Sequence, residues 1–142
     1  MTVEEDASHL YGAEHVRRYR ETHGRLGHRW KRGTSILLLT TVGRRSGEER
    51  TTPLIYGHAG DDYVVVASKG GSDEPPGWYA NLCERPEVEV QVGGERFRAR
   101  ARTASPEERE VLWRQMASHW PDYDAYQERT RREIPVVVLE RA

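Results

Sequence analysis

Short segments in which apolar residues cluster, or alternate with polar ones, dominate the chain and predict a protein built mainly from β-strands. Residues 88–92 (VEVQV) and 95–103 (ERFRARART) alternate strictly, and the pair Gly93-Gly94 between them is typical of a hairpin turn. Other segments are dense in leucine and β-branched residues, which favour strands. In chain order, the predicted strands are residues 35–42, 51–58, 62–68, 88–92, 95–103 and 134–140.

The first three predicted strands follow one another closely along the chain. The segments 43–50 and 59–62 between them are typical of turns, and this spacing favours an antiparallel meander. Because Pro53 lacks a backbone N–H, we expect the strand at 51–58 to lie at a sheet edge or to carry a bulge.

Helical signals are confined to four short segments. The clearest is a helix start at Ser105, where a serine cap, Pro106 at the first helical position and Glu108 three residues after the serine form a capping signature. The other three helical segments are residues 11–23, 78–86 and 121–132. Six strands with a few helices, no βαβ alternation and no repeat predict a mainly β (α+β) fold, in the form of a small antiparallel barrel.

The chain has 142 residues, the length of one domain, and we expect a tail and short helix over 1–24 and a single domain over 25–142. No apolar run approaches the roughly 20 residues of a membrane span, and the acidic N-terminus lacks the pattern of a secretory signal. The lone Cys83 cannot form an internal disulfide, so we expect a cytoplasmic location. The histidines are scattered and no metal-ligand spacing occurs, so we expect no metal site.

The charge is unevenly distributed along the chain. The formal net charge is −1, yet residues 17–50 contain ten Lys and Arg against three acids, so this segment carries +7 and the rest −8. Only Lys31 and Lys69 are lysines, so 20 of the 22 cations are arginines, whose planar guanidinium suits bidentate capture of carboxylate or phosphate. A basic segment in a nearly neutral chain indicates one anion-binding face, and not a general coat for nucleic acid.

The strongest candidate site is the turn at residues 43–53 (GRRSGEERTTP). Its two glycines bracket a turn whose backbone N–H groups can point outward, and Arg44, Arg45 and Arg50 add guanidinium groups around it. Backbone amides together with arginines suit phosphate or carboxylate. A solvated turn in which the two glutamates pair with the arginines explains the same residues equally well.

Three further segments are candidates for ligand binding. The strand exit at 68–71 (SKGG) allows close backbone approach, and residues 77–82 (GWYANL) place large aromatic side chains beside an asparagine. Trp120, Tyr123 and Tyr126 are spaced by three and share one side of a helical turn, where tyrosines can bind an aromatic substrate or donate a proton. A flexible strand exit and ordinary packing residues are the structural alternatives.

Four segments, taken together and in order, resemble a known family. They are residues 37–56 (LLLTTVGRRSGEERTTPLIY), 64–71 (VVVASKGG), 77–101 and 123–140. Over residues 25–140, with similar spacing, the chain resembles the deazaflavin-dependent nitroreductases, also described as coenzyme F-420-dependent quinone reductases. The resemblance implies a split antiparallel β-barrel with flanking helices, and a deazaflavin cofactor that bears a phosphodiester and an oligoglutamate tail.

The resemblance also implies roles for residues at matching positions. The phosphate and tail would meet Arg44, Arg45 and Ser46. Further cofactor contacts would come from Arg50, Thr51, Thr52, Pro53, Tyr56, Val66, Ala67, Ser68, Lys69, Trp78, Tyr79, Asn81 and Leu82. The catalytic candidates are Tyr123, Tyr126 and Ser68. Trp120 stands where some members have a further tyrosine.

The implied reaction is hydride transfer from the reduced deazaflavin to a quinone, a nitroaromatic or an activated enone. A tyrosine hydroxyl, Ser68 or Lys69 would donate a hydrogen bond or a proton to the acceptor oxygen. Two alternatives stay open: a split-barrel reductase that uses FMN, and a carrier that holds the deazaflavin without turnover. A binder of nucleic acid or anionic membrane built on residues 17–50 ranks below both, because the overall charge is −1. A homodimer and a peripheral membrane contact through the N-terminal segment are compatible with the sequence.

Overall fold

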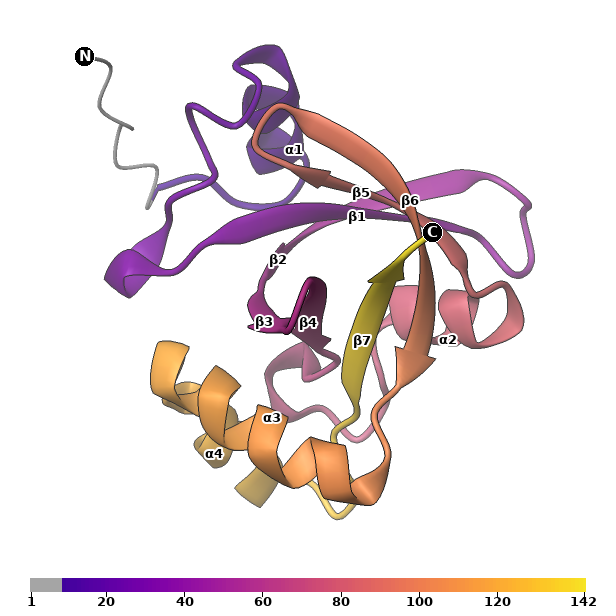
Figure 1. Cartoon of the computed structure of the whole chain (residues 1–142). Coiled ribbons are helices and arrows are strands. Elements are labelled where there is room, and N and C mark those ends of the chain that lie inside the picture. Colours follow the sequence, from indigo (N-terminus) through magenta and orange to yellow (C-terminus); the bar gives the residue numbers. More distant parts are fainter. Residues whose placement is uncertain (1–8) are drawn as a thin grey trace.

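Seven antiparallel strands form one strongly curved sheet, with helices packed around it (Figure 1). The computed structural model describes residues 9–142, so most of the predicted N-terminal tail lies outside the described residues. The strands are β1 (Ile36–Val42), β2 (Glu49–Ile55), β3 (Gly57–Ala59), β4 (Asp62–Val66), β5 (Glu87–Val92), β6 (Glu95–Thr103) and β7 (Val136–Arg141). The α-helices are α1 (Gly12–Glu21), α2 (Gly77–Glu84), α3 (Pro106–His119) and α4 (Asp122–Glu128), with short 3-10 turns η1 (Lys31–Gly33) and η2 (Lys69–Gly71). The predicted mainly β fold with flanking helices is confirmed.

The order of the strands across the sheet is β2-β1-β5-β6-β7-β4-β3, and it corrects the predicted meander. β2 pairs with β1 and β3 pairs with β4 as expected, whereas β4 also pairs with β7, at the end of the sheet opposite to β2. The single strand predicted over 51–58 is two strands, because β2 ends at Ile55 and β3 begins at Gly57. Only Tyr56 separates the two edge strands, so the chain itself joins the sheet's two ends and curls the sheet (Figure 1). Pro53 lies on the edge strand β2, as predicted.

The start of β3 is fixed by helix α3. Gly57 packs directly against Gln115 and Met116, where any larger residue would overlap both side chains. The side-chain amide of Gln115 accepts a hydrogen bond from the backbone N–H of His58 (2.9 Å) and donates one to its carbonyl (2.8 Å). The outer edge of this short strand is therefore occupied by a side chain of the same protein.

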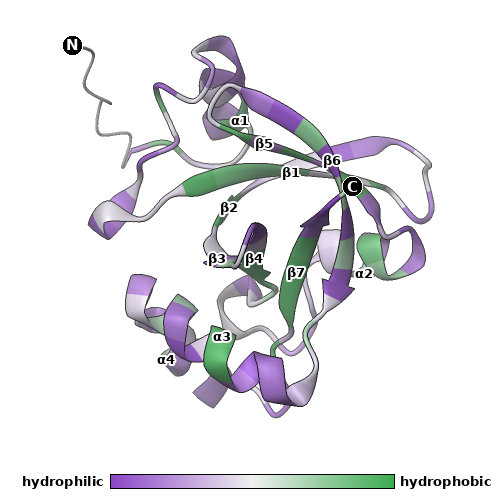
Figure 2. Ribbon diagram, in the orientation of Figure 1, coloured by the Kyte–Doolittle hydropathy of each residue, from purple (hydrophilic) through white to green (hydrophobic). Residues whose placement is uncertain are grey.

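Two apolar clusters use both faces of the central strands. In β1, Leu37 and Leu39 join a cluster that includes α2, while Ile36 and Leu38 join a cluster that includes α1, α3 and α4. Figure 2 shows the apolar colour along β1 and β7, whose residues are buried on both faces. A strand buried on both sides reads as a continuous apolar run, which is why the sequence marks these two strands so clearly.

The alternation in β6 separates a buried face from a charged face. Ala99 and Ala101 are buried, and three arginines of the other face pair with glutamates of neighbouring elements. Arg102 binds Glu108 at 2.7 Å, and Glu108 also closes the capping box with Ser105 at the start of α3. The Arg102 guanidinium and the cap together lower the pKa of Glu108 to about 2. The helix start that the sequence predicts is thus tied to the sheet.

No helix within residues 9–142 is both long enough and apolar enough to span a bilayer.

Candidate functional site

A hollow of about 350 Å³ with three arginines around it lies between the β1–β2 turn and the start of α2, and we call it the anion hollow. Seven of the residues around it are predicted cofactor contacts: Arg44, Arg45, Ser46, Arg50, Thr52, Trp78 and Asn81. The first N–H groups of α2 have no partner within the helix, and they carry the positive end of its dipole. Guanidinium groups and a helix N-terminus on facing sides make this hollow suited to an anion.

Asn81 connects the two sides of the anion hollow. Its side-chain oxygen accepts hydrogen bonds from the backbone N–H (3.1 Å) and the guanidinium (2.9 Å) of Arg44, and its amide nitrogen donates to Thr41 (3.2 Å). Asn81 is buried, so breaking these bonds would leave polar groups without water to replace them. The structure therefore gives Asn81 the task of positioning Arg44.

The arginines of the turn are not neutralised by the neighbouring glutamates. Within residues 9–142, their one ion pair joins Arg50 to Glu48 at 3.8 Å, and both side chains are largely exposed. Arg44 and Arg45 form none within the described part of the chain. The interpretation of this segment as a self-paired turn is therefore disfavoured by the geometry.

Three of the seven cations before the turn are engaged on α1. Arg17 and Arg18 pair with Glu14 and Glu21 on α1. Arg20 donates to the hydroxyls of two threonines on β1 and β2. Part of the basic character of residues 17–50 is thus used within α1, and the three arginines of the turn line the anion hollow.

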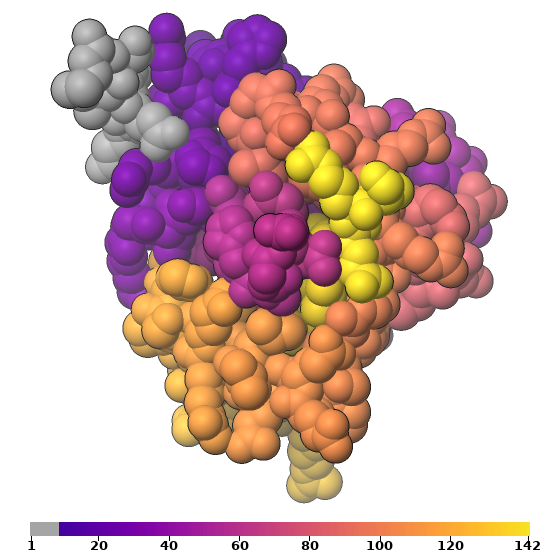
Figure 3. All heavy atoms as spheres, viewed as in Figure 1, coloured from indigo at the N-terminus to yellow at the C-terminus, as the bar shows by residue number. Residues whose placement is uncertain are grey.

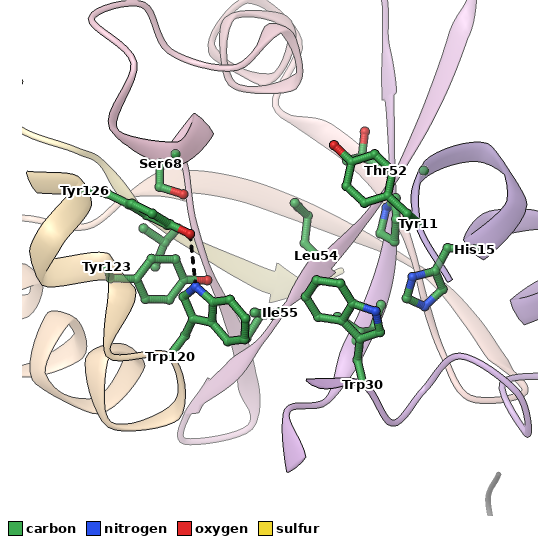
Figure 4. Close-up of a pocket in the computed structure, with 15 residues that line it drawn as sticks. Tyr11, His15, Trp30, Thr52, Leu54, Ile55, Ser68, Trp120, Tyr123 and Tyr126 are labelled. Carbon is green, nitrogen blue, oxygen red and sulfur yellow. Dashed lines mark hydrogen bonds between the residues drawn. The ribbon is translucent and has the colours of Figure 1, made fainter. Parts of the chain in front are cut away.

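A second hollow, a cavity of about 340 Å³, is drawn in Figure 4, and we call it the aromatic cavity. Six predicted site residues line it: Thr52, Pro53, Val66, Ser68, Tyr123 and Tyr126. Thr52 lines both hollows, so they meet on β2. A ligand with a charged end and a planar end can therefore occupy the two together. Within residues 9–142 no three His, Cys, Asp or Glu side chains gather as they would around a metal ion.

The two tyrosines of α4 differ in their surroundings. The hydroxyl of Tyr126 accepts a hydrogen bond from the indole nitrogen of Trp120 at 3.3 Å. Tyr123 is buried, and burial, with Tyr126 beside it, raises the pKa of the Tyr123 hydroxyl well above its ordinary value. The Tyr123 hydroxyl is therefore a weaker acid than a free phenol, and it can act as a hydrogen-bond donor.

One wall of the aromatic cavity comes from the N-terminal loop, and the sequence did not single it out as part of the site. Trp30 stacks on Trp120, with ring centroids 5.8 Å apart and planes at 22°. Figure 3 shows the N-terminal segment and the α3–α4 segment meeting on one side of the molecule. His15 also lines the cavity; its ring nitrogen lies 2.8 Å from the Gly27 carbonyl, and burial lowers its pKa. The sequence signal for this wall is Trp30, an aromatic residue that stands alone in a basic loop.

The loop after β4 is held by an arginine that sequence reasoning missed. The predicted helix over 121–132 ends at Glu128, and the chain then turns Arg132 back toward this loop. Its guanidinium donates to the carbonyls of Ser68 (2.9 Å) and Ser72 (2.7 Å). Gly71, at φ +84°, lies against the backbone of Tyr126. These contacts fix the cavity wall that contains Ser68.

Six predicted cofactor contacts line neither hollow. They are Thr51, Tyr56, Ala67, Lys69, Tyr79 and Leu82. Ala67 and Leu82 are buried in the apolar core. The Tyr79 hydroxyl lies 2.8 Å from Thr103, and burial raises its pKa. Contacts of these six residues with a cofactor stay a prediction.

Comparisons with known proteins identify the family. The model of the F420H(2)-dependent quinone reductase family matches residues 11–141. The chain is 45% identical over 126 residues to an F420H(2)-dependent quinone reductase of Mycobacterium tuberculosis. The match covers 87% of this chain and 85% of the mycobacterial protein.

Two solved structures share the fold. One, described as an F420-H2 dependent reductase, has a TM-score of 0.68 at 40% identity and covers 74% of this chain and 93% of that one. The other, described as a domain-swapped dimer, has a TM-score of 0.69 at 40% identity and covers 74% of this chain and 79% of that one. The predicted split-barrel architecture is thereby confirmed. Since the family model spans nearly all of the described residues, the chain belongs to the F420H(2)-dependent quinone reductase family.

Proposed function

We propose that this protein is an oxidoreductase that transfers a hydride from reduced coenzyme F-420 to a quinone. The observation that carries the proposal is the junction at Thr52, where an arginine-lined hollow meets a cavity walled by aromatic residues. The chain also belongs to a family that is named for this reaction. Nitroaromatics and activated enones are planar acceptors of the same kind, and we include them in the proposal.

The residues on the two hollows fit the cofactor's chemistry. The phosphodiester and glutamate carboxylates match Arg44, Arg45 and the N-terminus of α2. The planar ring matches the aromatic cavity, whose walls are mostly apolar with a few hydroxyl groups. When bound, reduced coenzyme F-420 supplies the hydride, and the protein supplies position and polarity.

Three hydroxyl groups of the aromatic cavity are suited to the acceptor. Negative charge develops on the acceptor oxygen as it is reduced, and a donor already in place stabilises that charge. Tyr126, Tyr123 and Ser68 line the cavity and can donate to such an oxygen. The raised pKa of Tyr123 suits it to donate a hydrogen bond and not to release its proton. Lys69 does not line the cavity, which favours the three hydroxyls over its amine.

The test is a binding titration followed by turnover. Purified protein is titrated with coenzyme F-420 and, separately, with FMN, and binding is followed by fluorescence. Reduced coenzyme F-420 is then mixed with menadione, with and without protein. We expect tight binding of coenzyme F-420, weak binding of FMN, and oxidation well above the uncatalysed rate. Tight FMN binding without binding of coenzyme F-420 would contradict the cofactor assignment, and binding without turnover would indicate a carrier.

The assembly and location of the protein are also part of the proposal. We infer a homodimer, since a solved structure 40% identical to this chain is described as a domain-swapped dimer. Light scattering of the purified protein tests this directly. A peripheral membrane contact would bring a lipid quinone to the cavity, whose lining includes the highly exposed Tyr11 (82%). Flotation with lipid vesicles tests that contact.

A further inference from the structure

The hydroxyl of Tyr126 has one hydrogen-bond partner within residues 9–142, the indole N–H of Trp120 (Figure 4). A phenolic hydroxyl stays close to the plane of its ring, so its proton takes one of two positions, on either side of the oxygen. An indole nitrogen can only donate, so its N–H must meet a lone pair of the Tyr126 oxygen. The hydroxyl proton is therefore directed away from Trp120.

We propose that Trp120 is a positioning residue: it selects the orientation in which Tyr126 offers its proton to the acceptor in the aromatic cavity. This inference rests on the proposed function, because the acceptor is the molecule that receives the hydrogen bond. Tyr126 and Trp120 both line the cavity, so a group bound there lies within reach of the Tyr126 hydroxyl.

Trp120 is itself held from several sides. Its ring stacks on Trp30. The guanidinium of Arg32 lies 4.4 Å from the centroid of the Trp120 ring and also forms an ion pair with Asp122 (3.3 Å). The backbone N–H of Trp120 donates to the carbonyl of Met116 at 2.9 Å. The donor is therefore fixed before any acceptor arrives, which is what an orienting hydrogen bond requires.

The ring of Tyr126 is fixed as well. Gly71 lies against its backbone, and the guanidinium of Arg129 lies 5.5 Å from its ring centroid. With the ring in place, the hydroxyl torsion is the remaining freedom, and Trp120 acts on that freedom. A tyrosine in place of Trp120 could both donate and accept, and so would not fix the direction of the proton.

The kinetic test replaces Trp120 by phenylalanine, which keeps an aromatic ring against Trp30 but removes the N–H. One neutral hydrogen bond changes a rate about two- to tenfold, so we expect kcat with menadione to fall by that factor. The Kd for coenzyme F-420 is measured as well, and kcat is compared at saturating cofactor, so that a lost ring contact in the cavity is separated from the lost hydrogen bond.

Two further variants separate positioning from a general structural effect. Trp113→Phe removes another indole donor between α3 and α4, the bond to Asp124 (2.7 Å), but Trp113 does not line the cavity, so kcat should not change. In a Tyr126→Phe background, Trp120→Phe should cost nothing more, because the group on which Trp120 acts is gone. An equal loss in both backgrounds, or an unchanged kcat in the single variant, would overturn the inference.

A second measurement needs neither cofactor nor turnover. The indole N–H proton of Trp120 gives one of four such NMR signals, which Trp120→Phe assigns by removing it. Tyr126→Phe should shift that signal upfield and speed its exchange with water, while the Trp113 signal stays in place. An unmoved Trp120 signal overturns the inference whatever the activity. If the wild-type protein neither binds nor oxidises reduced coenzyme F-420, the proposed function is overturned instead, and with it the role of Trp120 toward an acceptor.

Discussion

The anion hollow and the aromatic cavity are neighbours on β2, yet they are built in different ways. The anion hollow is formed by two stretches of chain, the turn at residues 43–52 and the start of α2, and Asn81 ties them together. The aromatic cavity draws its walls from segments far apart in the sequence, from Tyr11 to Tyr126. The anion hollow thus depends on a few neighbouring residues that can bind a charged group, whereas the aromatic cavity depends on the packing of the whole fold. Substitutions should therefore act mainly on binding at the first, and on stability together with turnover at the second.

The largest effect should come from the double variant Arg44→Ala with Arg45→Ala. Hydrogen bonds to charged groups contribute about 1.5–3 kcal/mol each, so we expect the Kd for coenzyme F-420 to rise about 100-fold or more. The salt dependence of binding should fall as well, since two screened interactions are lost. Fluorescence titration at several salt concentrations measures both.

The matched control is Arg17→Ala with Arg18→Ala, which removes the same charge from α1, where both arginines are paired with glutamates. Its Kd should stay within about twofold of the wild type, because exposed ion pairs on a helix contribute little. An equal loss of affinity in both double variants would show that net charge, and not the anion hollow, attracts the cofactor.

The next effect should appear at the aromatic cavity, in Gly71→Ala. Gly71 has φ +84°, and an added Cβ would lie 2.5 Å from the carbonyl oxygen of Tyr126. The left-handed backbone costs about 1–2 kcal/mol and the overlap adds to it, so we expect unfolding to become easier by roughly 2–3 kcal/mol. Urea denaturation measures this. Gly70→Ala is the control, because Gly70 has φ +62° with nothing within 4 Å, so it should lose only the backbone part. Equal losses in the two variants would mean that the contact with α4 does not contribute to the free energy of unfolding.

The same contrast explains how much the sequence could predict. The turn with Arg44 and Arg45 was predictable because its function lies in consecutive residues and backbone geometry. The strand pattern was predictable except at Tyr56, where the break between β2 and β3 depends on the packing of Gly57 against α3. The pattern of apolar and polar residues does not predict such a contact between distant segments, and it does not predict the pairing of β4 with β7 either.

Trp30 and Arg132 escaped prediction for a related reason. Trp30 reaches the site by stacking on Trp120, 90 positions later in the chain. Arg132 reaches the loop after β4 because α4 ends at Glu128, before the predicted end of the helix. Family resemblance named Tyr123 and Tyr126 as site residues, and the structure places both on the aromatic cavity. It could not say that their hydroxyls lie in different surroundings, because this depends on burial and on the donor from Trp120.

Asn81→Leu should give a smaller effect that sharpens the comparison from the side of the anion hollow. The replacement keeps the branched shape of the side chain but removes the acceptor for Arg44 and the donor for Thr41. We expect about tenfold weaker binding of coenzyme F-420, because Arg44 is no longer held, and a loss of stability of about 1–3 kcal/mol. Titration and denaturation measure the two. Leu39→Met, in the apolar cluster that packs against α2, controls for packing alone and should leave the Kd unchanged.

The smallest effect should be the pH dependence that His15 brings to the aromatic cavity. His15 is buried, and its pKa is lowered from the ordinary value of 6.5. The unfolded chain therefore takes up this proton at a higher pH than the folded chain does, and stability falls as the pH drops from about 6.5 to the lowered pKa. The slope in that window cannot exceed about 1.4 kcal/mol per pH unit, the value for one proton. In His15→Gln, which keeps a donor for the Gly27 carbonyl, this part of the slope should vanish, as urea denaturation at pH 7.5 and pH 5.5 would show. The same slope in both proteins would mean that protonation of His15 does not loosen this wall, and that the two hollows respond alike to acid.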